Sequence, residues 1–511
     1  MKSKMFKKLM AAALATTMIA SLTACGPAED GNTSQPTGGG GDDTGSTPTS
    51  QEPSGDNNTD PGEEVSEWGA PLRDENGNIY DLGGMEIVIR DWWSSEDVAE
   101  PTTEFEEKTQ EYREWIQETY NFKIKQVQIS SWGSALDDFQ DYYNTGGDDN
   151  NYVFTLRSDG SLINMMASGM MYDLATLDCL DFKEQKFQDN GVHELYASGK
   201  SIYAMYSGPS EPRTGIYFNK TLLKNAGYDG DDPYKWQANG EWTWAKFEEV
   251  CAAVQVDRDG DGNPDAYALN ANDGMFTNMA VFSNGGEYVG RDDATGKYLY
   301  KLEDAKTVEG LEWADKMFKE YWQKNEPVDE NGNAIWDYYK QAFVDGEYAF
   351  MVEDAYVGQN NFLAGQGDIV DFGFVMFPKN QDNNNFTKYV FKADNNPAVI
   401  PSVYDADRAW KIAFAWNLYT NDTPGYEGQD TSWKGSYYNG FADTEAIDQT
   451  LVMMRESGRS LNAYHLVIPN LQEGPELTWK VGPTGGPIST IIEETAPAWK
   501  GYIDELNAKI K

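Results

Sequence analysis

The segment Met85-Glu-Ile-Val-Ile-Arg90 alternates apolar and polar residues, is rich in β-branched side chains, and runs directly into Asp91-Trp92-Trp93. These features predict a β-strand that ends at an aspartate and two tryptophans. Four further elements are expected after it: a charged helix over 103–120, a strand over 122–129, a helix over 136–143 and a strand over 152–157. This β-α-β-α-β order predicts a parallel sheet with helices on both faces.

The carboxyl ends of these strands are the expected ligand site, because open α/β sheets bind their ligands beyond that edge. The first strand ends in Asp91, Trp92 and Trp93, and the third is followed by Arg157 and Asp159. Consecutive residues of a strand point in opposite directions, so both tryptophans are not expected in the core. Either ring alone could equally well cover the sheet.

Length and charge limit the function classes. The chain has 511 residues, with 40 Lys and Arg against 84 Asp and Glu and a net charge of −44. That length favours two compact lobes, and the acidity argues against nucleic acid or anionic lipid as a partner. The two histidines, His193 and His465, exclude a multi-histidine metal site. Three cysteines, at 25, 179 and 251, cannot build a disulfide framework.

The first 24 residues have the order of a signal peptide: a basic start, a short apolar run over 9–22 and small residues before Cys25. Leu22-Thr-Ala-Cys25 resembles the bacterial lipobox, which implies a lipid on Cys25. Residues 26–66 contain no Lys or Arg and nine carboxylates, so 25–66 is expected to be a disordered acidic tether. We therefore expect a lipid-anchored protein on the extracellular face of a bacterial cell membrane, with a Gram-positive type of envelope.

A calcium-binding loop is predicted between a helix and a strand. Oxygen ligands recur at the spacing that wraps one calcium ion: Asp257, Asp259, Asp261 and Asp265 through carboxylates, and Asn263 through its backbone carbonyl. The loop departs from the EF-hand pattern at its twelfth position, where Ala268 replaces glutamate. The alternative is a turn that solvates its own carboxylates. A structural Ca²⁺ ion is expected.

Six short motifs occur in an order that resembles the family 1 extracellular solute-binding proteins, the lipid-anchored receptors of ABC sugar importers. They lie at 199–203, 215–220, 242–247, 257–265, 343–351 and 372–378. The resemblance covers about residues 85–511. It implies a two-lobed α/β fold of the type II periplasmic-binding-protein class, in which each lobe is a sheet flanked by helices and a hinge joins the lobes.

On this resemblance residues 67–511 are the solute-binding domain. Lobe I spans about 84–214 and 389–450, and lobe II about 215–388 and 451–511, with crossovers near Tyr217 and Tyr389. The implied ligand-binding residues are Asp91, Trp92, Trp93, Arg157, Asp159, Asn272, Asp273, Phe276, Asp354, Tyr356 and Asn395. Tyr356 departs from the family, where many members have a stacking tryptophan. Each of these positions could also be an ordinary surface or packing residue.

The leading hypothesis is a monomeric, non-enzymatic receptor that captures an oligosaccharide and delivers it to ABC permease subunits. Aromatic rings stack on the C–H faces of pyranoses, and carboxylates and Arg bind their hydroxyls. Three alternatives remain: a secreted glycoside hydrolase, which needs only two suitably spaced carboxylates; a receptor of the same fold for peptides or another solute; and a surface adhesin.

Overall fold

The computed structural model divides into two units, residues 1–64 and 65–511, and only the second is described. The described residues are 66–511 apart from 96–99, 159, 293, 323–326, 334, 336, 362–370, 382–389, 392–394, 442, 457, 459, 472–476, 484 and 511. Cys25, the signal peptide, almost all of the tether, Asp159 and Tyr389 therefore lie outside them.

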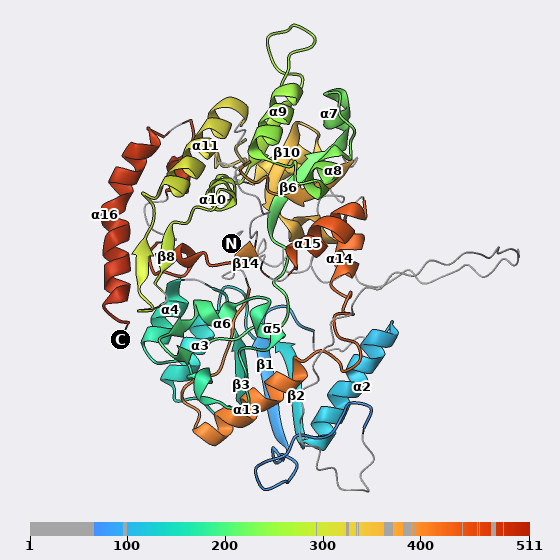
Figure 1. The fold of residues 1–511 in the computed structure, drawn as a ribbon, viewed down its shortest axis with the longest axis vertical. Coiled ribbons are helices and arrows are strands. Elements are labelled where there is room, and N and C mark those ends of the chain that lie inside the picture. Colours follow the sequence, from blue (N-terminus) through green and yellow to red (C-terminus); the bar gives the residue numbers. More distant parts are fainter. Residues whose placement is uncertain are drawn as a thin grey trace, which may run out of the picture. The chain divides into compact units, whose positions relative to one another are not determined.

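The first sheet has four strands in the order β13-β3-β1-β2 (Figure 1). It comprises β1 (Met85–Asp91), β2 (Phe122–Gln128), β3 (Asn151–Thr155) and β13 (Ala398–Val399). β1 is parallel to both β2 and β3, whereas β13 runs antiparallel to β3. The β-α-β-α-β prediction is confirmed, with β1 in the middle of its three parallel strands.

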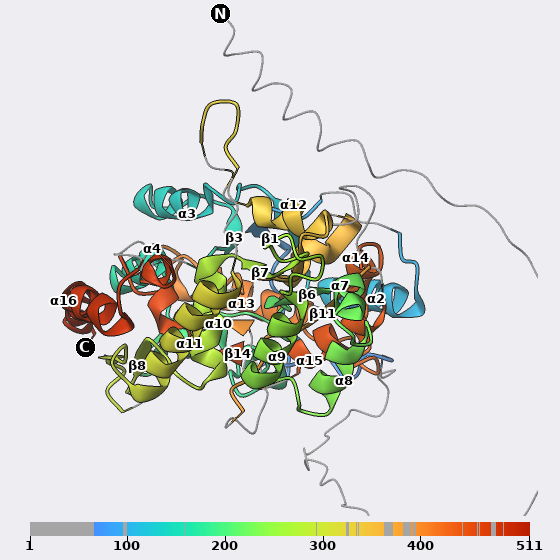
Figure 2. The same cartoon turned by 90° about the horizontal axis from the view of Figure 1, so that it is seen from above.

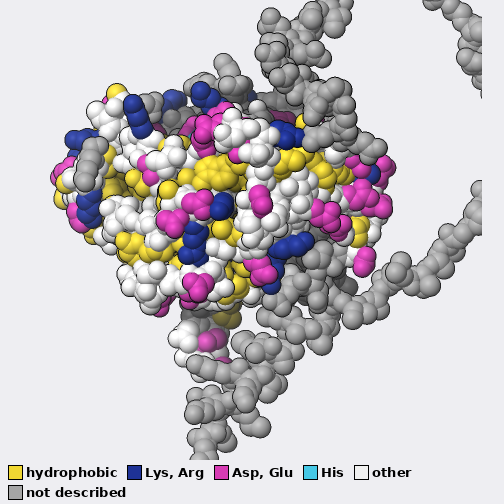
Figure 3. Space-filling model, turned by 90° about the horizontal axis from the view of Figure 1, so that it is seen from below, with side chains coloured by type: hydrophobic (Ala, Val, Ile, Leu, Met, Phe, Trp, Pro, Cys, Tyr) yellow, Lys and Arg dark blue, Asp and Glu magenta, His cyan; other side chains and the backbone are white. Residues whose placement is uncertain are grey.

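Helices α2 (Glu104–Thr119), α3 (Ala135–Asn144) and α13 (Ala406–Tyr419) accompany the first sheet. α2 begins with a capping box, in which Thr103 accepts from the Glu106 backbone and Glu106 accepts from the Thr103 backbone. The first turn of α2 is acidic, which suits the positive end of a helix dipole. Figure 3 views the molecule from below, and Asp and Glu side chains gather at the right-hand edge of this view, on the side of α2.

The second sheet has the order β11-β6-β10-β7. Its strands are β6 (Thr214–Asn219), β7 (Tyr267–Ala271), β10 (Tyr348–Asp354) and β11 (Phe372–Met376). β6 is antiparallel to both of its neighbours, and β10 is parallel to β7. β6 and β11 are buried throughout, because helices cover both faces. Figure 2 shows α9 (Trp244–Val254) and α12 (Tyr338–Val344) on opposite sides of these strands.

The remaining elements are shorter or lie around the two sheets. The helices are α4 (Gly160–Ala167), α5 (Gln185–Gln188), α6 (Val192–Leu195), α7 (Lys220–Asn225), α8 (Asp232–Ala238), α10 (Asp273–Ser283), α11 (Ala305–Tyr321), α14 (Lys434–Tyr438), α15 (Val452–Met454) and α16 (Ile488–Asn507). Short helical turns are η1 (Leu174–Thr176), η2 (Ala355–Asn361), η5 (Ala446–Leu451), η6 (Tyr464–Leu466) and η7 (Thr478–Lys480). Three strand pairs complete the fold: β4 (Ala197–Ser198) with β5 (Ser201–Ile202), β8 (Val289–Arg291) with β9 (Tyr298–Tyr300), and β12 (Val390–Phe391) with β14 (Ser460–Leu461).

The chain passes from the first sheet to the second at the carboxyl ends of β3 and β10. The first crossover leaves at Met205, which bridges to Ala398 beside the carboxyl end of β3, and enters the second sheet at Thr214. Thr214 pairs with Asp354, the carboxyl end of β10. Because this short crossover joins the two edges, they lie on the facing sides of the two sheets, and β6 rises from this side into the second sheet in Figure 1.

The chain passes to the second sheet again after α13. Residues 434–451 contain α14, which packs on η2, and η5, which packs on β11. This part of the segment 389–450 therefore packs against the second sheet, although the sequence-based boundary placed it with the first. None of the helices in the described ranges combines the length and apolar character that a membrane-spanning segment requires.

Candidate functional site

The two facing edges bring together most of the residues predicted to bind ligand. The first edge carries Asp91, Trp92 and Trp93 at the end of β1, Arg157 after β3 and Asn395 just before β13. The second edge carries Asn272 and Asp273 after β7, and Asp354 and Tyr356 at the end of β10. Of the other two predicted residues, Asp159 lies outside the described residues and Phe276 lies in the core.

Asp91 is fully buried and holds the turn that follows β1. Its carboxylate accepts hydrogen bonds from the backbone N–H groups of Trp93 (3.2 Å) and Ser94 (3.0 Å) and from Nε2 of Gln126 (2.7 Å). Ser94 Oγ donates a fourth bond, of 2.5 Å. Since these donors engage the carboxylate, we correct its expected role from contacting ligand to positioning the tryptophans.

The two tryptophans of this turn differ in environment. Trp92 is partly buried against the core, whereas Trp93 is 52% exposed. Their rings meet edge to face, with centroids 4.9 Å apart and an interplanar angle of 81°. The expectation that the pair does not lie wholly in the core is confirmed, and Trp93 is the more exposed of the two rings.

Arg157 lies against a tryptophan that the sequence analysis did not select. Its guanidinium carbon is 4.5 Å from the ring centroid of Trp132, which lies after β2 and is 61% exposed. The signal for Trp132 was a lone tryptophan in the Ser-Ser-Trp-Gly-Ser loop that follows the second predicted strand. It gained meaning only once β2 and β3 were known to flank β1.

On the second edge, side chains of the neighbouring strand β6 fix the segment that carries Asp354 and Tyr356. Thr214 Oγ1 donates a hydrogen bond of 2.8 Å to the Asp354 carboxylate. Burial raises the pKa of Asp354, and the charge of Arg213 opposes that rise. The Tyr217 hydroxyl is shared between the carbonyls of Asp354 (3.0 Å) and Ala355 (2.9 Å), and Tyr356 remains 47% exposed.

Beside these two residues, the neighbouring Glu353 is buried and accepts from the Tyr339 hydroxyl. Lys340 Nζ lies 3.4 Å from the Glu353 carboxylate. Because a tyrosine and a lysine already engage Glu353, this carboxylate helps to hold the end of β10 rather than facing a ligand.

Two of the predicted site residues at the start of α10 have structural roles. Asn272 is the N-cap, and its side chain accepts from the Met275 backbone N–H at 3.1 Å. Phe276 is fully buried, with ring centroids 5.5 Å from Trp313 and 5.0 Å from Phe318. Its expected ligand contact is therefore corrected to a core role. This leaves Asp273, in the first turn of α10, as the candidate for ligand contact from this loop.

A second aromatic residue missed by the sequence analysis lies beside α10. Trp479 is 61% exposed and belongs to η7, which packs on α10. Its segment is distant in sequence from the second sheet, so no local pattern indicated that it would lie near the start of that helix.

Asn395 is buried and connects the two crossovers. Its Nδ2 donates a hydrogen bond of 2.8 Å to Oγ of Ser210, which lies on the segment from Met205 to Thr214. Its backbone carbonyl lies 3.5 Å from Oγ of Ser158, beside Arg157. Asn395 therefore lies between the candidate site and the joining segments.

Three of the four carboxylates of the predicted calcium loop gather in the structure. Oxygens of Asp257, Asp259 and Asp261 lie within 4.8 Å of one another, and all three residues are exposed. Backbone N–H groups of Gly262 and Gly260 hydrogen-bond to Asp257 and lower its pKa. These oxygens are ligands that Ca²⁺ prefers, and they fit such an ion.

The fourth carboxylate of the loop is engaged elsewhere. Asp265 accepts from the backbone N–H of Arg258 at 2.7 Å and lies 3.8 Å from its guanidinium. Coordination of an ion by Asp265 would therefore require this pair to rearrange.

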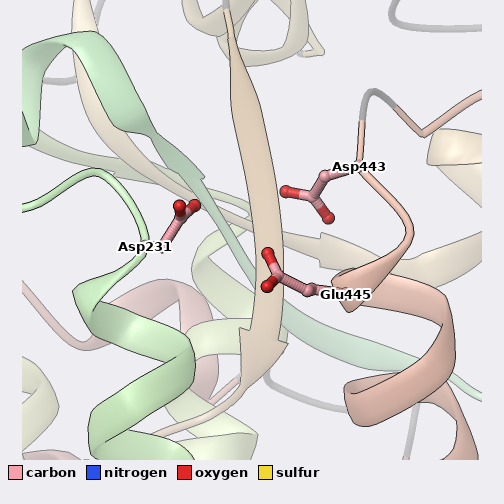
Figure 4. Close-up of side chains that lie close together, drawn as sticks. All are labelled: Asp231, Asp443 and Glu445. Carbon is pink, nitrogen blue, oxygen red and sulfur yellow. The ribbon is translucent and has the colours of Figure 1, made fainter.

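A second acidic group lies beside the second sheet, between the start of α8 and the segment before η5. Figure 4 shows Asp231, Asp443 and Glu445, contributed by the start of α8 and the segment entering η5. Lys220 Nζ lies 2.6 Å from carboxylate oxygens of both Asp231 and Asp443. Because the Lys220 ammonium group already lies between Asp231 and Asp443, we interpret the group as a partly buried ion-pair cluster rather than a metal site.

The comparisons with known proteins identify the fold. No family model and no curated protein sequence matches the chain. A cyclo/maltodextrin-binding protein complexed with maltotetraose is 12% identical, with a TM-score of 0.54 over 83% of this chain and 98% of that one. UspC of M. tuberculosis is 14% identical, with a TM-score of 0.51 over 82% and 100%.

A cyclic α-maltosyl-1,6-maltose binding protein from Arthrobacter globiformis is also similar. It is 12% identical, with a TM-score of 0.50 over 84% of this chain and 100% of that one. Since these matches cover 82–84% of this chain, which is more than either sheet with its helices contains, they extend over both sheets. The chain therefore has the two-lobed periplasmic-binding-protein-like fold that its sequence motifs imply.

Proposed function

We propose that this protein captures an oligosaccharide between the two facing sheet edges and delivers it to the permease subunits of an ABC transporter. The observation that carries the proposal is the exposure of aromatic rings on both edges: Trp93 on the first and Tyr356 on the second. Large rings normally bury most of their surface, and here they lie where open α/β sheets bind ligands.

The chemistry of the edges suits a neutral, polyhydroxylated ligand. Pyranose C–H faces pack on aromatic rings, and their hydroxyls bind carboxylates and guanidinium groups. Asp273, Asp354 and Arg157 supply these groups beside the exposed rings. The fold relatives support this class of ligand, since one was solved with maltotetraose and another is a cyclic α-maltosyl-1,6-maltose binding protein.

The cellular setting is part of the same proposal. Cys25 carries a lipid, residues 25–66 tether the folded unit to the outer face of a bacterial membrane, and the receptor acts as a monomer without catalysis. The order of basic, apolar and lipobox residues before Cys25 supports this arrangement. A Ca²⁺ ion in the loop from Asp257 to Asp265 is proposed to be structural.

The test uses the protein without its signal peptide. It is titrated calorimetrically with maltotetraose, cyclic maltosyl-maltose and chitotetraose, and a tetrapeptide serves as control. We expect saturable binding of at least one glycan, no binding of the tetrapeptide, and no new reducing ends after prolonged incubation. Binding of the peptide alone would favour a receptor for another solute. Release of reducing ends would identify a glycoside hydrolase instead.

A further inference from the structure

Three tryptophans among the described residues expose more than half of their side chains: Trp93, Trp132 and Trp479. Trp93 and Trp132 follow neighbouring strands of the first sheet, and Trp479 lies on η7 beside the start of α10. The other described tryptophans are buried or partly buried. The most exposed indoles therefore lie at or beside the two edges that face each other.

Trp132 and Arg157 meet across the end of β1. The sheet order places β1 between β2, which precedes Trp132, and β3, which precedes Arg157. Strands on either side of a common neighbour are about 10 Å apart, yet the guanidinium lies 4.5 Å from the indole centroid. The pair therefore spans the carboxyl end of the central strand, next to the turn that bears Trp93.

The loop that carries Trp132 is fixed by hydrogen bonds at both ends. The Asp91 carbonyl accepts from the backbone N–H groups of Ile129 (3.1 Å) and Ser130 (3.2 Å), which attaches the loop to β1. On either side of Trp132, Ser131 and Ser134 bond to each other, with the Ser131 hydroxyl donating to Oγ of Ser134 at 2.9 Å. An exposed ring on a fixed loop loses little conformational entropy when a ligand packs on it.

We propose that Trp132, oriented by Arg157, forms a second sugar-stacking subsite beside the Trp93 subsite. The guanidinium covers one face of the indole, so the opposite face is the one that can pack on a pyranose ring. Trp93 packs against Trp92 rather than Trp132, so the two exposed rings receive different sugar units. The site therefore takes a disaccharide or longer chain, which deepens the proposed function and rests on it.

Besides offering N–H groups to ligand hydroxyls, Arg157 orients the Trp132 ring. A planar guanidinium stacks on an indole face, and a lysine ammonium cannot reproduce that contact. We therefore expect Arg157→Lys to lose part of the affinity although the charge is kept. Trp132→Phe keeps a stacking face and should retain most of the affinity.

The experiment titrates the parent and four variants with the glycan that the parent binds best among maltotetraose, cyclic maltosyl-maltose and chitotetraose. Trp132→Ala should bind about thirtyfold more weakly, while Trp132→Phe and Arg157→Lys should each lose less than Trp132→Ala. Leu72→Ala is the control, since Leu72 is 49% exposed and its backbone bonds to Tyr120, before the start of β2 and away from the carboxyl ends of the strands. All four should melt within a few degrees of the parent.

Quenching of tryptophan fluorescence by acrylamide tests the contact itself. Bound glycan should protect the fluorescence of the parent from quenching more than that of Trp132→Phe, because the variant lacks the indole that the glycan covers. A parent that binds none of the three glycans would overturn the proposed function together with this subsite. A parent that binds, with equal affinity and equal protection in the Trp132 variants, would overturn the subsite alone.

Discussion

Asn395 donates a 2.8 Å hydrogen bond from Nδ2 to Oγ of Ser210, and this bond joins the two chain segments that connect the sheets. Both residues are buried. An unpaired buried polar group costs about 1–3 kcal/mol, so Ser210→Ala, which removes the acceptor of Asn395 Nδ2, should reduce the free energy of unfolding by about that amount. Urea denaturation measures the change, with the exposed Asn76→Ala as control. An unchanged denaturation midpoint would show that the bond does not stabilise the crossovers.

The two tryptophans of the β1 turn should separate binding from stability. Trp93→Ala removes an exposed ring and should weaken glycan binding about thirtyfold with little change in melting temperature. Trp92→Ala removes a ring that packs against the core and should lower the melting temperature by several degrees. Calorimetric titration and melting of both variants test this pair. Normal binding by Trp93→Ala would exclude Trp93 from the site.

His465 should make the protein less stable at acidic pH. Burial against Phe282 and Tyr288 lowers the pKa of His465 to about 3, from an unfolded value near 6.5. The unfolded chain therefore binds a proton that the folded chain excludes, and this contribution to stability is lost as pH falls from about 6.5 towards 3. The slope is at most about 1.4 kcal/mol per pH unit.

The measurement for His465 is urea denaturation at pH 7.5, 6, 5 and 4, for the parent and for His465→Phe. The variant should lose less stability than the parent over this range, because its ring cannot be protonated. Identical pH dependence in the two proteins would assign the acid sensitivity to other groups.

Calcium should stabilise the fold through the Asp257–Asp265 loop. A ligand of the folded state at a hundredfold excess over its Kd adds about 2.7 kcal/mol, so chelation should lower the melting temperature. Asp259→Ala should abolish that response. Asp329→Ala is the control, since Asp329 accepts backbone N–H groups in a similar exposed turn outside the gathered carboxylates. A parent indifferent to chelation would contradict the calcium proposal.

Local pattern was sufficient to predict the three parallel strands of the first sheet and the edge that carries the candidate site, but not the antiparallel strand β13. Alternation and helix signals are local properties, so β1, β2, β3 and their helices follow from short segments. Exposure depends on distant packing, however. Phe276 reads as a loop aromatic but packs in a core with Trp313 and Phe318, which come from α11.

Strand order is the other property that the local pattern does not contain. The contact of Arg157 with Trp132 exists because β2 and β3 lie on either side of β1. The sequence places these residues in different loops, and it assigned a ligand role only to Arg157. Likewise, the packing of residues 434–451 on the second sheet depends on contacts with η2 and β11 that lie far away in the chain.

The ion pair of Lys220 with Asp231 and Asp443 fastens the last passage of the chain to the second sheet, while α13 packs that passage's other end onto the first. Thr423 and Tyr426 of this passage hydrogen-bond to Thr109 and Glu104 beside the first sheet, and α14 packs on η2 beside the second, so residues 427–433 lie between the anchored ends. Within this passage, a rotation of one sheet relative to the other is then taken up as backbone torsion in that stretch, because both of its ends are anchored. The salt bridge, which is remote from the ligand edges, and the packing of α14 together determine which residues of this passage twist.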